Sequence, residues 1–156
     1  MPQKTMRGVI PTPFDFALEL TCSSTAIITG DFVARTALRA RCPSRLLQEA
    51  ARQVRSYWRR QLDVFTVPLA LQGTEFECAV WRLVSRLHFG EFLSYSDVAY
   101  AVGHPGAHRA VAAAMGRTPI DLFIPAHRVI GADGRLKGCA PGSMRERLYS
   151  FERNKG

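Results

Sequence analysis

Cysteine side chains are the strongest candidate nucleophiles and metal ligands in this 156-residue chain. The chain has four of them, Cys22, Cys42, Cys78 and Cys139, and they are scattered along the sequence. No two have the close Cys-x-x-Cys spacing that zinc sites and redox pairs use. The spacing therefore predicts reduced thiols and no metal site.

Residues 124–129, with the sequence IPAHRV, form the centre of the candidate site. The segment follows a predicted helix-turn-helix and precedes a glycine-containing turn at residues 132–134. It contains His127 and Arg128 but no thiol, because residue 126 is alanine. What these side chains can do depends on the elements around them.

The elements that position this segment begin at Thr74. Thr74 and Glu77 form a capping box ahead of an apolar stripe, which predicts a helix that ends at residues 89–92. Ser94 starts a shorter helix, and a second helix runs through residues 107–115 after a glycine-containing turn. This pair predicts a helix-turn-helix.

Two further elements follow the helix-turn-helix. Residues 122–124 are apolar and predict a short buried strand. Ser143 is a candidate N-cap for a last helix, which carries apolar residues on one face.

The second helix of the pair is unusually slim. It carries Arg109 among small side chains, Ala110, Ala112, Ala113 and Ala114. Such a helix packs tightly against another helix or inserts into a narrow groove of DNA, and the sequence alone leaves both open.

The first part of the chain is predicted to combine strands with one helix. Residues 16–28 alternate in places and contain a Ser-Ser turn signal, which predicts a hairpin. A helix is predicted from Ser44 to Leu62, with apolar residues at helical spacing. Four arginines lie off its apolar stripe and either contact phosphates or form a solvated face: Arg45, Arg52, Arg55 and Arg59.

The charge of the chain favours a polyanionic partner. The formal net charge is +8 and the isoelectric point is about 9.9. Residues 1–73 carry 10 basic and 5 acidic side chains, and residues 74–156 carry 11 and 8, so neither end is a basic tail. DNA or RNA is the first candidate, and a basic surface without a partner is the alternative.

Membrane insertion and secretion are not indicated by the sequence. No apolar run approaches the roughly 20 residues of a transmembrane helix. Pro11, Pro13, Asp15 and Glu19 interrupt any signal-peptide core. We expect a cytoplasmic protein that is a monomer.

From Thr74 onward, the chain resembles the O6-alkylguanine-DNA alkyltransferases, also called methylated-DNA–protein-cysteine methyltransferases. The motifs come in the family's order and form a specific set. They are Thr74-Glu75-Phe76, Val80-Trp81, Gly90-Glu91, Ser94-Tyr95, Gly103-His104-Pro105, Arg109-Ala110-Val111 and Pro125-Ala126-His127-Arg128-Val129. Residues 46–73 also resemble the family's N-terminal domain, and residues 1–40 match weakly.

The resemblance implies a mixed α/β fold with two domains. A small N-terminal α/β domain would span residues 1–72. A mainly helical C-terminal domain, with a helix-turn-helix of the alkyltransferase type, would span residues 73–156. It would bind double-stranded DNA through the minor groove and turn an alkylated guanine out of the stack into a pocket.

The resemblance also implies site residues. Arg109 matches the arginine that fills the space of the flipped nucleotide, and Tyr95 matches the tyrosine that helps to turn it out. The residues expected to contact DNA are Tyr95, Arg109, Ala110, Ala113 and Arg128. The residues expected to line the lesion pocket are Tyr95, Pro125, Val129, Cys139 and Ser143.

The family's reaction is a single irreversible alkyl transfer to a cysteine thiolate, without a metal or an organic cofactor. A free thiol has a pKa of about 8.5, so a neighbouring histidine that is polarised by a carboxylate raises the thiolate fraction. His127 matches this base and Glu152 matches its carboxylate partner. Ala126 occupies the acceptor position, where the family has cysteine.

A methyl group at residue 126 cannot accept an alkyl group, which leaves several interpretations. In the first, the chain resembles the alkyltransferase-like proteins, which carry alanine or tryptophan here. It would hold the lesion and present it to another repair pathway, with nucleotide-excision repair proteins as candidate partners. Thr118, Cys139 and Pro141 replace the family's usual Asn, Tyr and Gly, which favours this interpretation.

In the second interpretation, the protein is an active methyltransferase whose cysteine at position 126 was changed to alanine. The presence of Tyr95, Arg109, His127 and Glu152 favours it. In the third, Cys139 has taken over as the acceptor. A different class is a helix-turn-helix regulator that binds nucleic acid without a lesion preference.

Overall fold

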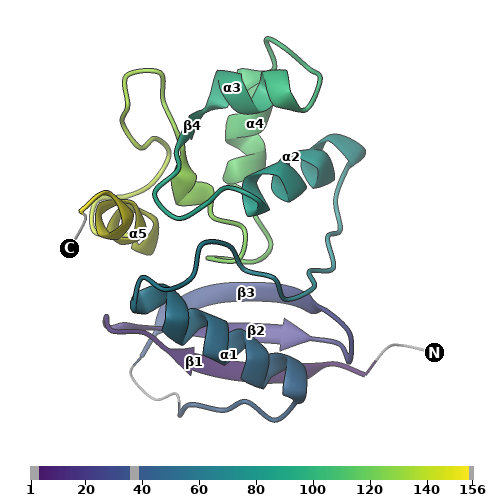
Figure 1. Cartoon of the computed structure of the whole chain (residues 1–156). Helices are drawn as coiled ribbons and strands as arrows, with labels where there is room; N and C mark the ends of the chain where they lie inside the picture. Colours follow the sequence, from purple (N-terminus) through teal and green to yellow (C-terminus); the bar gives the residue numbers. More distant parts are fainter. Residues whose placement is uncertain (1–3, 36–38, 155–156) are drawn as a thin grey trace. The chain divides into compact units, whose positions relative to one another are not determined.

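The computed structural model describes residues 4–35 and 39–154 of the chain. They form two compact units: one contains the described residues up to Leu71 together with Pro119–Leu122, and the other contains Gln72–Thr118 together with the described residues from Phe123 onward. One unit is built on a sheet and the other is mainly helical (Figure 1). The expected mixed α/β fold class is confirmed.

The first unit is built on a three-stranded antiparallel sheet in the order β1-β2-β3. Its strands are β1 (Met6–Pro11), β2 (Phe16–Cys22) and β3 (Ile27–Ala34). β2 and β3 form the predicted hairpin, with Leu20 opposite Gly30.

Helix α1 (Arg45–Trp58) packs against β1 and β2. The Ser44 hydroxyl accepts a hydrogen bond from the backbone N–H of Leu47, as its predicted role of N-cap requires. The helix ends at Trp58 rather than Leu62, because Arg60 takes a left-handed conformation with φ 60°. The core of this packing consists of Ile10, Leu18, Leu20, Cys22, Leu47, Ala50, Val54 and Tyr57, each at most 1% exposed.

Pro119–Leu122 belongs to the first unit, although both flanking segments belong to the second. The N–H of Gly30 donates to the carbonyl of Pro119 at 3.0 Å, and the N–H of Asp121 donates back to Gly30 at 2.8 Å. A Cβ on Gly30 would lie 2.7 Å from the Leu20 side chain and 3.2 Å from that of Ile120. Glycine therefore lets this segment approach β3 closely.

The second unit contains short elements around a small parallel strand pair. Its elements are α2 (Glu75–Ser85), β4 (Leu93–Ser94), α3 (Tyr95–Ala101), α4 (His108–Met115), the 3₁₀ turn η1 (Ala126–Arg128), β5 (Val129–Ile130) and α5 (Met144–Arg153).

Caps start three of these helices. Thr74 and Glu77 form the predicted capping box of α2, and Ser94 and Asp97 form another at α3. Ser143 caps α5 as predicted. α2 ends at Ser85, earlier than the predicted stop at residues 89–92.

The predicted helix-turn-helix is present as α3 and α4. Gly103 and Gly106 in the connecting turn have φ values of 83° and 89°, which non-glycine residues rarely adopt. The indole N–H of Trp81 on α2 donates to the carbonyl of Ala114 at 3.0 Å and holds α4 in place.

The predicted strand at residues 122–124 is wrong. Leu122 has φ 70°, and the segment forms a turn with isolated bridges. Its three side chains are at most 2% exposed, so the predicted burial is correct. Within the described residues, no helix has both the length and the apolar character needed to cross a membrane.

Candidate functional site

A tight turn fixes the position of residue 126. The N–H of Ala126 donates to the carbonyl of Ile124 at 2.8 Å, across Pro125 with φ −79° and ψ 74°. This is an inverse γ-turn, and the proline ring restricts its φ in advance. Ala126 is 8% exposed, at the start of η1.

The β4–β5 pair places this segment beside the start of α3. Leu93 pairs with Val129 and Ser94 pairs with Ile130 in parallel register. Because Ser94 is the N-cap of α3, Tyr95 follows directly on the paired strand. The sequence-distant Tyr95 and residues 126–130 are therefore neighbours.

The side chains of His127, Arg128 and Glu152 form a buried cluster. Nε2 of His127 contacts Oε2 of Glu152. Nε of Arg128 donates to Oε1 of Glu152 at 2.8 Å and Nη2 donates to Oε2 at 3.0 Å. All three residues are 1% exposed.

The backbone between α2 and β4 completes this cluster. The N–H of Gly90 donates to Oε1 of Glu152 at 2.9 Å, and Nη1 of Arg128 donates to the carbonyl of Leu87 at 2.6 Å. The buried carboxylate and guanidinium are thus paired with each other and further hydrogen-bonded, which such charges require.

The expectation that Arg128 contacts DNA is corrected by this geometry. Its guanidinium is 1% exposed and is taken up by Glu152 and Leu87. A phosphate cannot reach it without breaking the cluster. The side chain instead stabilises the site through its hydrogen bonds to Glu152 and to the Leu87 carbonyl.

The cluster sets the protonation states of its members. Burial lowers the pKa of His127, and this outweighs the opposing hydrogen bond and charge of Glu152, while Arg128 and Arg145 lower it further. Burial alone would raise the pKa of Glu152, but the hydrogen bonds and charges of His127 and Arg128 hold it well below its ordinary value. A neutral imidazole that donates from Nε2 to a carboxylate keeps its lone pair on Nδ1.

Tyr95 lies near two groups from the C-terminal part of the chain. Burial raises the pKa of its phenol, the Arg145 guanidinium opposes this, and the Cys139 thiol adds to it. Arg145 also donates from Nη2 to the carbonyl of Met115, at the end of α4, at 2.7 Å. Arg145 therefore hydrogen-bonds to the end of α4, and its charge acts on both Tyr95 and His127.

The two faces of α4 differ in exposure. Val111 and Ala114 are 0% exposed, so packing explains the small residue at position 114. Arg109, Ala110 and Ala113 are exposed. Tight packing within the chain therefore does not explain the exposed alanines.

The remaining predicted pocket residues lie in different surroundings. Pro125 and Val129 are buried within the 124–129 segment, and Cys139 is a partly exposed free thiol. The Ser143 hydroxyl accepts from the N–H of Glu146 at 3.3 Å, so it is used in capping α5. Among the described residues, no cluster of three or more His, Cys, Asp or Glu could hold a metal ion.

Sequence analysis missed Arg145 and the backbone groups of Leu87 and Gly90. Arg145 is one of several arginines on a polar helix, and no spacing distinguishes it. Gly90 has φ 78°, and its place in the Gly90-Glu91 motif was the one available signal.

Comparisons with known proteins assign the chain to one family. Residues 75–153 match the family model described as 6-O-methylguanine DNA methyltransferase, DNA binding domain. The methylated-DNA–protein-cysteine methyltransferase of Methanosarcina barkeri is 41% identical over 111 residues, which are 70% of each chain. The chain belongs to the methylated-DNA–protein-cysteine methyltransferase family of DNA-repair alkyltransferases.

Solved structures agree with this membership. The Mycobacterium tuberculosis O6-methylguanine methyltransferase superposes with a TM-score of 0.81 at 31% identity, covering 98% of this chain and 95% of that chain. The structure of Mycobacterium tuberculosis OGT in complex with DNA gives a TM-score of 0.79 at 32% identity, covering 93% and 91%. The fold is thus matched over both units.

Proposed function

We propose that this protein binds duplex DNA, turns O6-alkylguanine into a pocket beside Ala126, and holds it without transferring the alkyl group. One observation carries the proposal: the side chain at the acceptor position is a methyl group. It has no lone pair with which to displace guanine from an alkyl carbon.

The DNA-facing part of the proposal rests on α3 and α4. The exposed alanines Ala110 and Ala113 allow α4 to enter a narrow groove, and Arg109 occupies the space left by the flipped nucleotide. Tyr95 helps to turn that nucleotide out of the stack. The solved complex of Mycobacterium tuberculosis OGT with DNA supports DNA binding by this fold.

The lesion pocket is proposed to lie among Tyr95, Ala126, His127 and the 138–142 loop. In a protein that does not transfer, the imidazole of His127 is a hydrogen-bonding and supporting group. The held lesion is then a signal for another repair pathway, and nucleotide-excision repair proteins are the proposed recipients.

A second function is favoured by the intact cluster of His127 and Glu152: active methyl transfer by a protein with cysteine at position 126. The thiol proton would pass to Nδ1 of His127, while the Nε2–H group keeps its proton and its hydrogen bond to Glu152. The thiolate would attack the alkyl carbon, and the bond from that carbon to guanine O6 would break with its electron pair on guanine. The proton that His127 took from the thiol would pass through solvent to the guanine anion, which leaves neutral guanine and neutral imidazole.

The test compares Ala126→Cys with the chain as given on O6-methylguanine duplex DNA. Intact mass reports methyl uptake, and binding to lesion and undamaged duplexes at one fixed salt concentration reports recognition. We expect the given chain to prefer the lesion duplex and to gain no mass. If the Ala126→Cys variant also stays unmodified while both proteins bind the lesion, the pocket serves recognition alone.

Other outcomes favour the competing functions. Prompt methylation of the Ala126→Cys variant would mean that the pocket remains built for transfer. A methyl group on Cys139 of the given chain would make that thiol the acceptor. Equal affinity for both duplexes would favour a lesion-independent regulator and would overturn the proposal.

A further inference from the structure

A row of arginines runs along α1 in the first unit. Arg45, Arg52 and Arg55 lie on one face of the helix, and Arg59, the C-cap residue four positions beyond Arg55, continues their row. All four are exposed. We call these four residues the arginine stripe, which spans about 21 Å at the rise of an α-helix.

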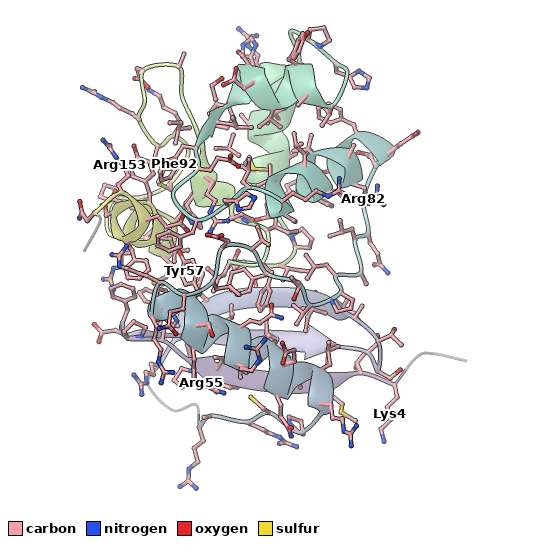
Figure 2. All side chains as sticks on the ribbon, viewed as in Figure 1. Lys4, Arg55, Tyr57, Arg82, Phe92 and Arg153 are labelled. Carbon is pink, nitrogen blue, oxygen red and sulfur yellow. The ribbon has the colours of Figure 1, made fainter. Side chains whose placement is uncertain are left out.

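The stripe faces away from the sheet of its own unit. The opposite face of α1 carries Leu47, Val54 and Tyr57, each 0% exposed. Figure 2 labels one residue of each face, the exposed Arg55 and the buried Tyr57. The side chains of the stripe are therefore free of the core that holds the helix in place.

The positive charge of the stripe is poorly compensated. Arg52 pairs with Glu49, which lies beside the stripe, at 2.5 Å. Within the described part of the chain, Arg45, Arg55 and Arg59 form no salt bridge with a carboxylate. The helix dipole favours a cation at Arg55 in the last turn and at the C-cap Arg59, but it disfavours one at Arg45, the first residue of α1, so helix stability does not account for the whole stripe.

We propose that the arginine stripe binds the phosphate backbone of DNA, as a contact surface separate from α4. Guanidinium groups match phosphate oxygens in two-point hydrogen bonds, and a stripe of this length reaches several successive phosphates. The proposal rests on the proposed DNA binding and adds a second surface to it.

A lipid surface fits the stripe less well. A helix that lies in a membrane interface inserts an apolar face. The apolar face of α1 is buried against β1 and β2, and the exposed face carries arginines with Gln48 among them. The stripe offers charge without an apolar anchor, which suits a phosphate backbone.

The test measures binding of the full chain to undamaged duplex DNA over a series of salt concentrations. Arg45→Gln/Arg55→Gln removes two charges from the stripe. Lys4→Gln/Arg7→Gln is the matched control, because it removes two exposed charges from β1 and the residues before it in the same unit. We expect the slope of log K against log salt to fall by about 0.9 per lost phosphate contact in the stripe variant, and to stay unchanged in the control.

Two results would overturn the proposal. Equal losses of slope in both variants would mean that only the overall charge matters, and an unchanged slope in the stripe variant would mean that no phosphate is bound there. The ratio of affinities for lesion and undamaged duplexes, measured on the same variants, tests the proposed lesion recognition independently. A ratio of one would reject lesion recognition without affecting the slope comparison.

Discussion

Glu152 receives hydrogen bonds from parts of the chain that are distant in sequence. Gly90 donates from the connection between α2 and β4, and His127 and Arg128 donate from η1. Removing one partner of a buried ion pair leaves the other charge uncompensated, which costs more than the pair itself contributes. The carboxylate therefore supports folding as well as the candidate chemistry.

The substitution Glu152→Gln is expected to lower the free energy of unfolding by about 3–5 kcal/mol at pH 7.5, because Arg128 stays buried without its counter-charge. The pKa of Glu152 is depressed in the folded chain, so its contribution is present above the ordinary value of 4.5 and is lost as the pH falls below that value. The difference between variant and parent should therefore shrink at acid pH. Urea unfolding at several pH values measures it.

Glu146→Gln is the control for this prediction, because Glu146 is an exposed carboxylate on the same helix. We expect it to cost less than about 1 kcal/mol. A Glu152→Gln loss of the same size would contradict the structural role of the cluster. His127 adds to the pH dependence that Glu152 causes. Because its pKa is lowered in the folded chain, its contribution to stability is lost as the pH falls below the ordinary value of 6.5.

At the scale of elements, α4 presents two kinds of alanine one residue apart. Ala114 lies in the core, with its carbonyl bonded to Trp81, and Ala113 lies on the surface. The same substitution at the two positions therefore separates the packing of the helix from its proposed entry into a groove.

We expect Ala114→Leu to destabilise the fold by about 1–3 kcal/mol through overpacking. Ala113→Leu should change stability by less than about 0.5 kcal/mol, since the side chain is exposed. It should nevertheless weaken DNA binding several-fold, because a wider helix no longer fits the groove. Thermal unfolding and DNA titrations measure the two effects, and normal DNA binding by Ala113→Leu would speak against groove entry.

Local chemistry made the starts of the elements predictable. Hydroxyl caps at Ser44, Thr74 and Ser143 follow from sequence, because a cap needs only neighbouring residues. The ends were less predictable. Arg60 and Leu122 take positive φ values that their side chains disfavour, and such conformations are imposed by the surrounding structure.

The candidate site was predictable where short motifs carried it. Residues 124–129 and Glu152 were selected from the family resemblance, and the contact between His127 and Glu152 is present. The burial of Arg128 was not foreseen, because a charged residue in a motif suggests exposure. Arg145 was missed because its importance comes from tertiary neighbours rather than from sequence spacing.

At the scale of the whole molecule, the chain passes between its two units more than once. Pro119–Leu122 belongs to the first unit. The predicted division into residues 1–72 and 73–156 assigns this segment to the second. The N–H of Phe32 also donates to Oδ2 of Asp121 at 3.1 Å. The first unit is thus completed by residues far along the sequence.

Residues 1–72 produced alone are expected to be less stable than the same unit closed by Pro119–Leu122. The loss of Ile120, which is 0% exposed, should cost about 1.5–3 kcal/mol by itself. Residues 118–123 appended through a glycine-serine linker should restore this stability in urea unfolding. The same fusion with Ile120→Ser should not, and equal stability of all three proteins would contradict the prediction.

The buried pair of Arg128 and Glu152 has a consequence for how activity is inferred from this kind of site. Evolution or an engineer could exchange the reactive atom at position 126 and leave the supporting network intact, because folding alone is reason enough to retain it. A histidine hydrogen-bonded to a buried carboxylate then shows that the fold is intact, and it does not show that the site is active. In this protein, reactivity depends on the side chain at position 126, whereas the stability of the fold depends on Arg128 and Glu152.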